Sequence, residues 1–302
     1  MALYLGLDFG GTKLAAGFAD ESGRLLSFAR CPTDPSAGPI GALAAMRALA
    51  ENMGQAAPQA VGISFGGPVD SSRQRCLLSH HGPGWEDFPL VERVAEIWHR
   101  PVVMDNDANA AALGEFCFGA GRDQRNLLYV TVSTGIGGGV ILDGEIYRGS
   151  HGLSGEIGHT IVAADGPLCA CGKRGCLEAF ASGPAISRTY AREARLASDK
   201  VTAENVFANA ASGDQIARQV LDRAIQALGI ALANASNLLD PDIIVIGGGV
   251  SGAGDALFRP LSQIMHSLSA PAPADTVAIV PAELGDAVGV LGAVALVSST
   301  GR

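Results

Sequence analysis

The sequence has no cluster of basic residues and few charged residues overall. Charged side chains make up 17% of its 302 residues, and the formal net charge is −9. Nucleic-acid binding depends on lysine and arginine patches that neutralise phosphates, so this composition argues against a DNA or RNA partner. An acidic chain that binds an anionic nucleotide must do so locally, through backbone N–H groups, a lysine and a metal ion.

Long hydrophobic segments and a secretory leader are also missing. The longest apolar stretches, 224–235 and 286–298, are rich in Ala and Gly and too short to span a bilayer. The opening residues, MALYLGLDFGG, lack the basic region and cleavage site of a signal peptide. We therefore expect a cytoplasmic protein with no membrane partner.

The sequence does contain a dense group of cysteines. Cys169, Cys171 and Cys176 fall within eight residues, and His159 precedes them. In a cytosolic chain such a cluster indicates metal binding before disulfides. Three thiolates and one imidazole complete a tetrahedral Zn²⁺ shell, and because the protein fills all four positions, the predicted zinc is structural. The alternative is three unrelated thiols.

The order of predicted elements indicates an α/β protein with two lobes and a cleft, since 302 residues are many for one core. Residues 3–7, 14–19 and 25–30 predict an antiparallel meander, and 126–149 repeat its strand–turn–strand pattern, which suggests a duplicated lobe. Further strands are predicted at 60–67, 101–107 and 276–280, and residues 242–254 are predicted as a strand, a glycine turn and the start of a helix. Helices are predicted at 40–53, 89–99, 108–118 (after a possible Asp107 cap), 178–195, 203–211, 214–237 and 286–298.

Three glycine-rich turns follow apolar strands. In the first, Asp8 to Lys13 (DFGGTK), Gly10 and Gly11 let backbone N–H groups close around phosphate oxygens, Thr12 and Lys13 add donors, and Asp8 is placed to hold Mg²⁺. The second, 133–139, includes Thr134 and Gly135 and predicts a second phosphate hairpin. Either turn is also compatible with an ordinary hairpin.

The third glycine turn, 247–252, includes Gly248 and Gly249 and fits G-x-G-x-x-G. It is compatible with a dinucleotide fingerprint, with Glu283 as the ribose acid, or with a turn on which adenosine lies. A nicotinamide or flavin oxidoreductase built on this segment would leave the other glycine turns and the cysteine cluster unexplained.

Carboxylates supply the candidate chemistry. Asp107 follows a predicted strand and opens a helix, and phosphoryl transfer needs a group that accepts the proton of the attacking hydroxyl. We take Asp107 as this base, with Asn106 positioning sugar hydroxyls; simple helix capping is the alternative. Glu156 and Glu178 flank the cysteine cluster and suit recognition of vicinal hydroxyls, although each alone is compatible with a solvated surface acid.

Taken in order, the motifs LDFGGTK, GGPVD, PGWEDFPL, DNDANAA, STGIGGG, GEIGH, CACGKRGCLEAFASG and IGGGVS closely resemble those of the ROK family (repressor, open reading frame, kinase), and most of all its bacterial glucokinases. The resemblance runs from Leu5 to about Ala295. It implies an actin-like ATPase fold with two ribonuclease-H-like lobes: an N-terminal lobe, 1–117, joined by a C-terminal helix at about 288–302, and a larger lobe, 118–287, that carries the zinc loop.

The resemblance also implies transfer of phosphate from ATP to the 6-hydroxyl of a hexose, most readily glucose, by a homodimer or homotetramer. It places Asp107 at the catalytic base. The sugar-binding positions it implies are Gly67, Asn106, Asp107, Glu156, His159 and Glu178. The nucleotide positions are Gly10, Gly11, Thr12, Lys13, Thr134, Gly135, Gly248 and Gly249. The zinc ligands are His159, Cys169, Cys171 and Cys176.

The resemblance leaves the preferred sugar, the phosphate donor and a repressor role open. His81 stands where relatives often have a sugar-contacting asparagine, whereas Glu156, which some acylmannosamine kinases replace with histidine, favours glucose. N-acetylmannosamine or N-acetylglucosamine kinase is one alternative, and polyphosphate or ADP is an alternative donor. A sugar-sensing repressor of the same family is another, but Asp8 leaves no space ahead of it for a helix-turn-helix.

Overall fold

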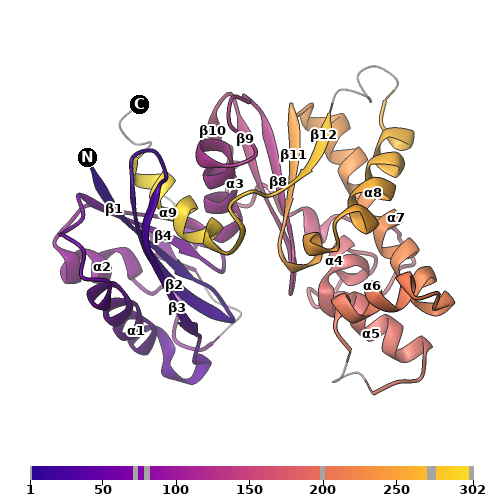
Figure 1. The fold of residues 1–302 in the computed structure, drawn as a ribbon, viewed down its shortest axis with the longest axis horizontal. Helices are drawn as coiled ribbons and strands as arrows, with labels where there is room; N and C mark the ends of the chain where they lie inside the picture. The colour runs from indigo at the N-terminus through magenta and orange to yellow at the C-terminus, as the bar shows by residue number, and fades with distance from the viewer. Residues whose placement is uncertain (1, 71–73, 78–81, 198–200, 271–276, 299–302) are drawn as a thin grey trace.

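A computed structural model describes residues 2–70, 74–77, 82–197, 201–270 and 277–298. Its frame is two five-stranded sheets, set side by side in Figure 1. The first has the order β3-β2-β1-β4-β7 and the second the order β10-β9-β8-β11-β12. In each sheet three strands form an antiparallel meander and two more run parallel to its first strand.

The strands of the first sheet are β1 (Leu3–Phe9), β2 (Lys13–Asp20), β3 (Leu25–Pro32), β4 (Ala60–Phe65) and β7 (Val102–Asn106). Those of the second are β8 (Leu127–Val132), β9 (Ile136–Leu142), β10 (Glu145–Ile146), β11 (Ile243–Gly247) and β12 (Ala278–Pro281). A short ribbon, β5 (Val69–Asp70) and β6 (Arg75–Cys76), lies beside the first sheet. The shared strand order confirms the predicted duplication and the ribonuclease-H-like α/β class.

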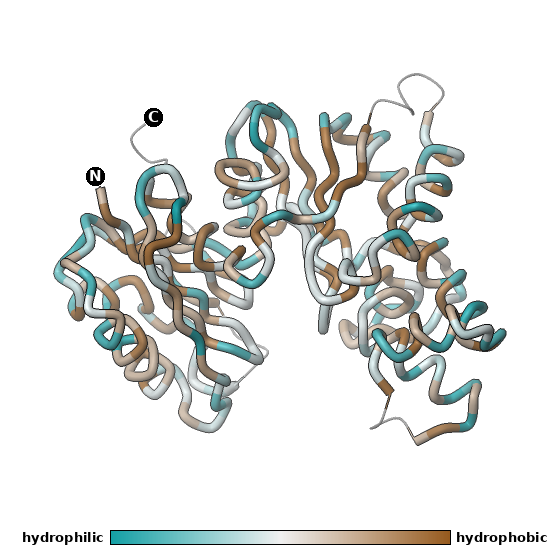
Figure 2. The backbone as a smooth tube through the Cα atoms, viewed as in Figure 1, coloured by the Kyte–Doolittle hydropathy of each residue, from teal (hydrophilic) through white to brown (hydrophobic). Residues whose placement is uncertain are grey.

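Helices cover both faces of each sheet. On the first sheet, α1 (Gly38–Asn52) and α2 (Leu90–Trp98) share one core with the strands, and α9 (Val288–Ser298) packs against β1 and β4. On the second, α3 (Asp107–Phe118) covers β8 and β9. The other face carries α4 (Leu177–Ala181), α5 (Gly183–Glu193), α6 (Ala203–Ala211), α7 (Gln215–Leu239) and α8 (Asp255–Leu268). In Figure 2 the sheet strands are largely hydrophobic, whereas the outer turns of the helices are hydrophilic.

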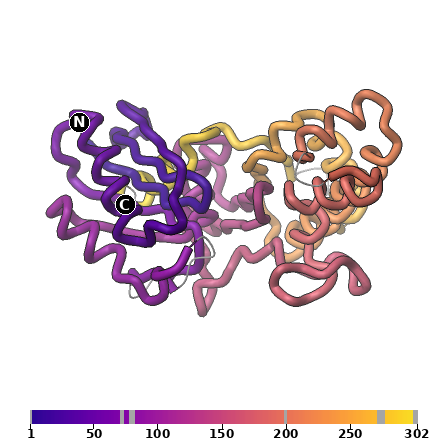
Figure 3. Tube along the Cα trace, turned by 90° about the horizontal axis from the view of Figure 1, so that it is seen from below, coloured from indigo at the N-terminus to yellow at the C-terminus, as the bar shows by residue number. Residues whose placement is uncertain are grey.

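The end of the chain returns to its beginning. In Figure 3 the C-terminal segment crosses from the second sheet to the first, where α9 packs beside the first strands of the sequence. Every residue from Gly289 to Val297 of α9 is buried, so this helix is hydrophobic all round. The packing is consistent with assigning the last helix to the N-terminal lobe, although the lobe boundaries, 1–117 and 118–287, stay predictions.

Three local predictions need correction. The N-cap of α3 is Asn106, whose Oδ1 accepts from the backbone N of Ala108 and Asn109, and Asp107 is the first helical residue. The helix predicted at 178–195 is two helices, because Ser182 adopts an extended conformation and caps α5. After β11 the chain passes through a short 3₁₀ turn at Gly249–Ala253 before α8 begins. Of the strand predicted at 276–280, the first residue lies outside the described part of the chain.

No helix within the described ranges is both long and apolar enough to cross a bilayer.

Glycines set how closely α9 approaches the first sheet. A Cβ atom added to Gly62 on β4 would overlap the carbonyl oxygen of Ala293, and one added to Gly6 on β1 would overlap that of Val290. The backbone of α9 therefore rests directly on the backbone of two neighbouring strands. A methyl group at either position can be accommodated only if the helix moves.

We therefore expect Gly62→Ala to lower the free energy of unfolding by about 1–3 kcal/mol or more, as overpacking does in a tight core. Gly252→Ala is the matched control, because its added Cβ meets nothing within 4 Å and its φ is not positive. The control is expected to stay within about 0.5 kcal/mol of the wild type. Urea unfolding followed by circular dichroism measures both, and equal midpoints for the two variants would contradict the close contact.

Candidate active site

A cavity of about 400 Å³ lies between the two sheets, and most of the predicted site residues line it. It is lined by Asp8, Gly10, Gly11, Thr12, Lys13, Gly67, Asn106, Asp107, Thr134, Gly135, Glu156, His159 and Glu178, among others. These residues span more than half of the sequence, so the fold and not local sequence brings them together. Gly248 and Gly249 are the two predicted nucleotide residues that are not in this lining.

The corner where β7 becomes α3 places Asp107 in the cavity. Asn106 ends the strand and caps the helix: its Oδ1 accepts from Ala108 N at 2.9 Å. The Nδ2 atom of the same side chain donates to the carbonyl oxygen of Gly67 at 3.1 Å. This double use fixes Asn106 against the turn after β4, so the two predicted sugar-binding positions Gly67 and Asn106 are in direct contact. Both polar atoms of the Asn106 side chain are therefore already hydrogen-bonded within the protein.

The carboxyl group of Asp107 has a pKa well above the usual value for an aspartate. Although the side chain is exposed to the cavity, protein crowds around the carboxylate, and this loss of hydration is the main cause that raises its pKa to about 7. The negative charge of Asp8 contributes to the same rise, while hydrogen bonds from Ala108 and Asn106 oppose it. A carboxylate that titrates near neutral pH is suited to accept a proton from a hydroxyl group.

Asp8 lies near the end of β1 and lines the same cavity as Asp107. Ser64 Oγ donates to Asp8 Oδ1 at 2.8 Å. Burial raises the pKa of Asp8, and the bond from Ser64 and the charge of Lys13 counteract this. The start of α9 closes on the same side chain, because a Cβ at Gly289 would overlap the Asp8 carboxylate. Two acidic groups therefore share this part of the cavity, an arrangement that attracts a divalent cation.

The two predicted phosphate hairpins occupy equivalent places in the two sheets. Gly10 to Thr12 connect β1 to β2, and Ser133 to Gly135 connect β8 to β9, and both turns line the cavity. Lys13 lies 3.4 Å from Asp286, which also pairs with Arg30 at 2.6 Å. Asp286 lines the cavity as well, although no sequence motif indicated a role for it.

The third glycine turn lies at the end of β11. Gly248 has a φ of +83°, and a Cβ there would overlap the backbone of Val132 on the neighbouring strand β8. Close packing and the positive φ therefore require a glycine at position 248. Glu283, considered above as a ribose acid, pairs instead with Arg122 at 3.3 Å.

The predicted zinc ligands come together in one cluster. The ligand atoms of His159, Cys169, Cys171 and Cys176 all lie within 4.8 Å of one another. The sulfurs of Cys171 and Cys176 are 3.6 Å apart, close to the edge of about 3.8 Å expected for a tetrahedron with Zn–S bonds of about 2.3 Å. Three soft thiolates and an imidazole are the donor set of a structural zinc site, so the residues present fit that ion.

The cysteine cluster adjoins the cavity through Glu178. Helix α4 begins directly after Cys176, and Glu178 is in its first turn. Its Oε2 accepts from the backbone N of Ile136 at 2.9 Å, and its Oε1 lies 3.9 Å from Cys169 Sγ. Glu178 thus links the cysteine cluster to the start of β9, next to the second phosphate hairpin. Glu156 lies one residue before the short 3₁₀ turn that carries His159.

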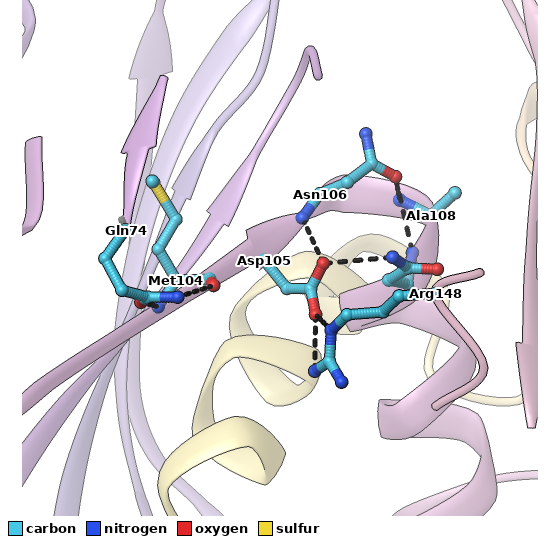
Figure 4. A network of polar contacts seen from close by, with 7 residues as sticks. Gln74, Met104, Asp105, Asn106, Ala108 and Arg148 are labelled. Carbon is cyan, nitrogen blue, oxygen red and sulfur yellow. Dashed lines mark hydrogen bonds and ion pairs between the residues drawn. The ribbon is translucent and has the colours of Figure 1, made fainter. Parts of the chain in front are cut away.

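Sequence reasoning missed a polar network beside Asp107, drawn in Figure 4. The buried carboxylate of Asp105 is paired with Arg148 and accepts from Asn109. Gln74 bonds both the backbone N and O of Met104, one residue earlier on β7. No local pattern pairs Asp105 with Arg148, which is 43 residues away. His81, which stands where relatives often have a sugar-contacting asparagine, lies outside the described residues.

Comparison with known proteins gives a consistent result. The ROK family model matches residues 4–300. A glucokinase of Halalkalibacterium halodurans is 39% identical over 96% of this chain and 93% of its own, and an N-acetylmannosamine kinase of Citrobacter koseri is 35% identical over 97% of each. The crystal structure of a ROK family glucokinase from Streptomyces griseus in complex with glucose and AMPPNP superposes with a TM-score of 0.85, at 35% identity, over 98% of this chain and 99% of that one.

These matches cover almost the whole chain, and they agree with the two-sheet topology and with the motifs that line the cavity. The chain belongs to the ROK family.

Proposed function

We propose that this protein is an ATP-dependent hexose kinase that phosphorylates the 6-hydroxyl of glucose. The observation that carries the proposal is one cavity in which Asp107, with a pKa of about 7, faces both glycine hairpins and the carboxylates Glu156 and Glu178. A donor site and an acceptor site therefore meet at a base. The glucokinases among its relatives support the same activity.

In the proposed mechanism the sugar binds beside the cysteine cluster. Glu156, Glu178 and His159 accept or donate hydrogen bonds to ring hydroxyls, and Asn106 and the backbone of Gly67 complete the acceptor wall. Asp107 accepts the proton of the 6-hydroxyl as its oxygen attacks the terminal phosphorus of ATP, and ADP leaves. Protein on several sides of the cavity excludes water, which would otherwise compete as the acceptor.

The nucleotide is proposed to lie between the hairpins at Gly10–Lys13 and Thr134–Gly135, which both line the cavity. Gly248 and Gly249, outside the lining, would contact only the adenosine end. Asp8 would hold Mg²⁺ directly or through water, and that ion neutralises charge on the phosphates when bound. Zn²⁺ at His159, Cys169, Cys171 and Cys176 would hold the sugar loop in place.

Substrate preference is the finer part of the proposal. The N-acetylmannosamine kinases among the relatives make an N-acylhexosamine the second candidate acceptor. Glu156 favours glucose, because some acylmannosamine kinases of the family are expected to carry histidine there. A repressor role is less well supported, since the net charge of −9 opposes DNA binding. A homodimer or homotetramer and a cytoplasmic location stay predictions.

A coupled assay of the purified protein with ATP and a panel of hexoses tests the activity. We expect kcat/KM to be highest for glucose and lower for mannose, N-acetylglucosamine and N-acetylmannosamine. Polyphosphate and ADP are included as donors and are expected to be poorer than ATP. A higher kcat/KM for N-acetylmannosamine would select the second candidate, and the absence of phosphorylation of every sugar would refute the kinase.

Replacing the base tests the mechanism. Asp107→Asn keeps the size of the side chain but removes proton acceptance, so kcat is expected to fall by about 10²–10⁴-fold while KM for glucose changes little. Asp222→Asn on the exposed face of α7 is the control and should keep wild-type kinetics. A wild-type kcat in Asp107→Asn would remove this residue from the mechanism.

The same group fixes the pH dependence. Only deprotonated Asp107 can accept a proton, and its pKa is about 7, so kcat/KM should fall as the pH drops below about 7. Because Asp8 raises that pKa, Asp8→Asn should move the acid limb to lower pH while also weakening Mg²⁺ dependence. An acid limb near pH 4 in the wild type would contradict the assignment.

Metal analysis tests the cysteine cluster. We expect about one zinc ion per chain, and a marked loss of zinc in Cys171→Ser. Because the cluster fixes Glu178 and His159, the loss of zinc should raise KM for the sugar more than KM for ATP. Cys31→Ser, on β3, is the control and should keep its zinc. A zinc-free wild type with full activity would rule out the structural role.

A further inference from the structure

The carboxylate of Asp105 is buried directly behind the catalytic corner. It is the fourth residue of β7, two positions before Asp107, and its side chain is 2% exposed. A buried carboxylate is costly unless it is both paired and hydrogen-bonded. The partners that satisfy Asp105 are therefore fixed in place, and they come from two different parts of the chain.

One oxygen of Asp105 holds the start of α3. Oδ1 accepts from the backbone N of Asn106 at 2.8 Å and from Asn109 Nδ2 at 3.0 Å. Asp107 lies between these two donors in the sequence, in the first turn of the helix. The Nδ2 of Asn109 makes this bond, while its Oδ1 has no hydrogen-bond partner in the described part of the chain. The orientation of the first helical turn, and with it Asp107, depends on Asp105.

The other oxygen of Asp105 binds Arg148, which follows β10 of the second sheet. Oδ2 accepts from Arg148 Nε and from a terminal guanidinium nitrogen, both at 2.7 Å. Figure 4 shows the two contacts as dashed lines. Arg148 follows β10, and its backbone carbonyl accepts from Ser154 N at 3.1 Å, which closes the loop 148–154 at its base. Gly152, Leu153 and Ser154 of this loop line the cavity, and Glu156 follows two residues later.

We propose that Arg148 is a positioning residue that, through Asp105, sets the catalytic corner at Asp107 against the loop that leads to Glu156. This inference rests on the proposed kinase function. It means that one ion pair sets the distance between Asp107 and the loop that leads to Glu156. The pair joins β7 of the first sheet to the segment after β10 of the second, so it acts across the cavity's two walls.

Arg148 makes a contact that a lysine cannot reproduce. Two nitrogens of its planar guanidinium contact the same carboxylate oxygen, and together they restrict the direction of the side chain as well as its distance. A lysine would neutralise Asp105 from a single point and leave the loop free to turn. Arg148→Lys therefore separates the positioning role from simple charge compensation.

We expect Arg148→Lys to lower kcat/KM for glucose by about 10²-fold, the effect typical of a displacement of about 1 Å in an active site, while KM for ATP stays within about twofold. The double variant Arg148→Met, Asp105→Asn, which leaves no unpaired buried charge, should show the same loss. In Arg148→Ala, added guanidinium ion should recover part of the activity.

Arg125→Lys is the matched control. Arg125 also pairs with an aspartate at 2.8 Å, but its side chain and that of Asp143 are 75% and 74% exposed, so its kinetics should be those of the wild type. Zinc content and urea unfolding of each variant measure whether it is folded.

Glucose kinetics of Arg148→Lys equal to those of Arg125→Lys, in an active wild type, would overturn this inference and leave the kinase standing. Equal losses toward glucose and ATP, or unfolding of both the single and the double variant, would also overturn it, because Arg148 would then be structural only. A wild type that phosphorylates no sugar would overturn the kinase and this inference together.

Discussion

The direct passage from β7 into α3 is the constraint on which the cavity depends. Asn106 ends the strand and Asp107 begins the helix, with no linker between them. The strand belongs to the first sheet, whereas the helix packs on β8 and β9 of the second. The residue at the junction must therefore lie where the two sheets meet. Since β1, β4 and β7 run parallel, their carboxyl ends bring Asp8 and Gly67 to the same edge.

Charge at this edge is divided among three aspartates with different surroundings. Asp105 is neutralised by Arg148, and Asp8 is partly compensated by Ser64 and Lys13. Among the described residues, no cation lowers the pKa of Asp107. Burial and the charge of Asp8 raise that pKa to about 7. The cysteine cluster then fixes the opposite wall through Glu178.

Much of this was readable from the sequence because the information is local. Strand–turn–strand patterns gave both meanders, and the spacing of His159 and the three cysteines gave the cluster that the fold assembles. Contacts distant in sequence were not readable. Nothing local pairs Asp105 with Arg148, or indicates that Gly62 receives the backbone of α9. Local rules also misassigned the cap of α3, which is Asn106 and not Asp107.

A crystal structure with glucose and a non-hydrolysable ATP analogue tests most directly whether the phosphate donor and the sugar meet at Asp107. We expect the sugar's 6-oxygen within about 2.6–3.2 Å of an Asp107 carboxylate oxygen, with the phosphates between the hairpins at Gly10–Lys13 and Thr134–Gly135. A sugar bound with its 6-hydroxyl turned away from Asp107, or outside this cavity, would contradict it.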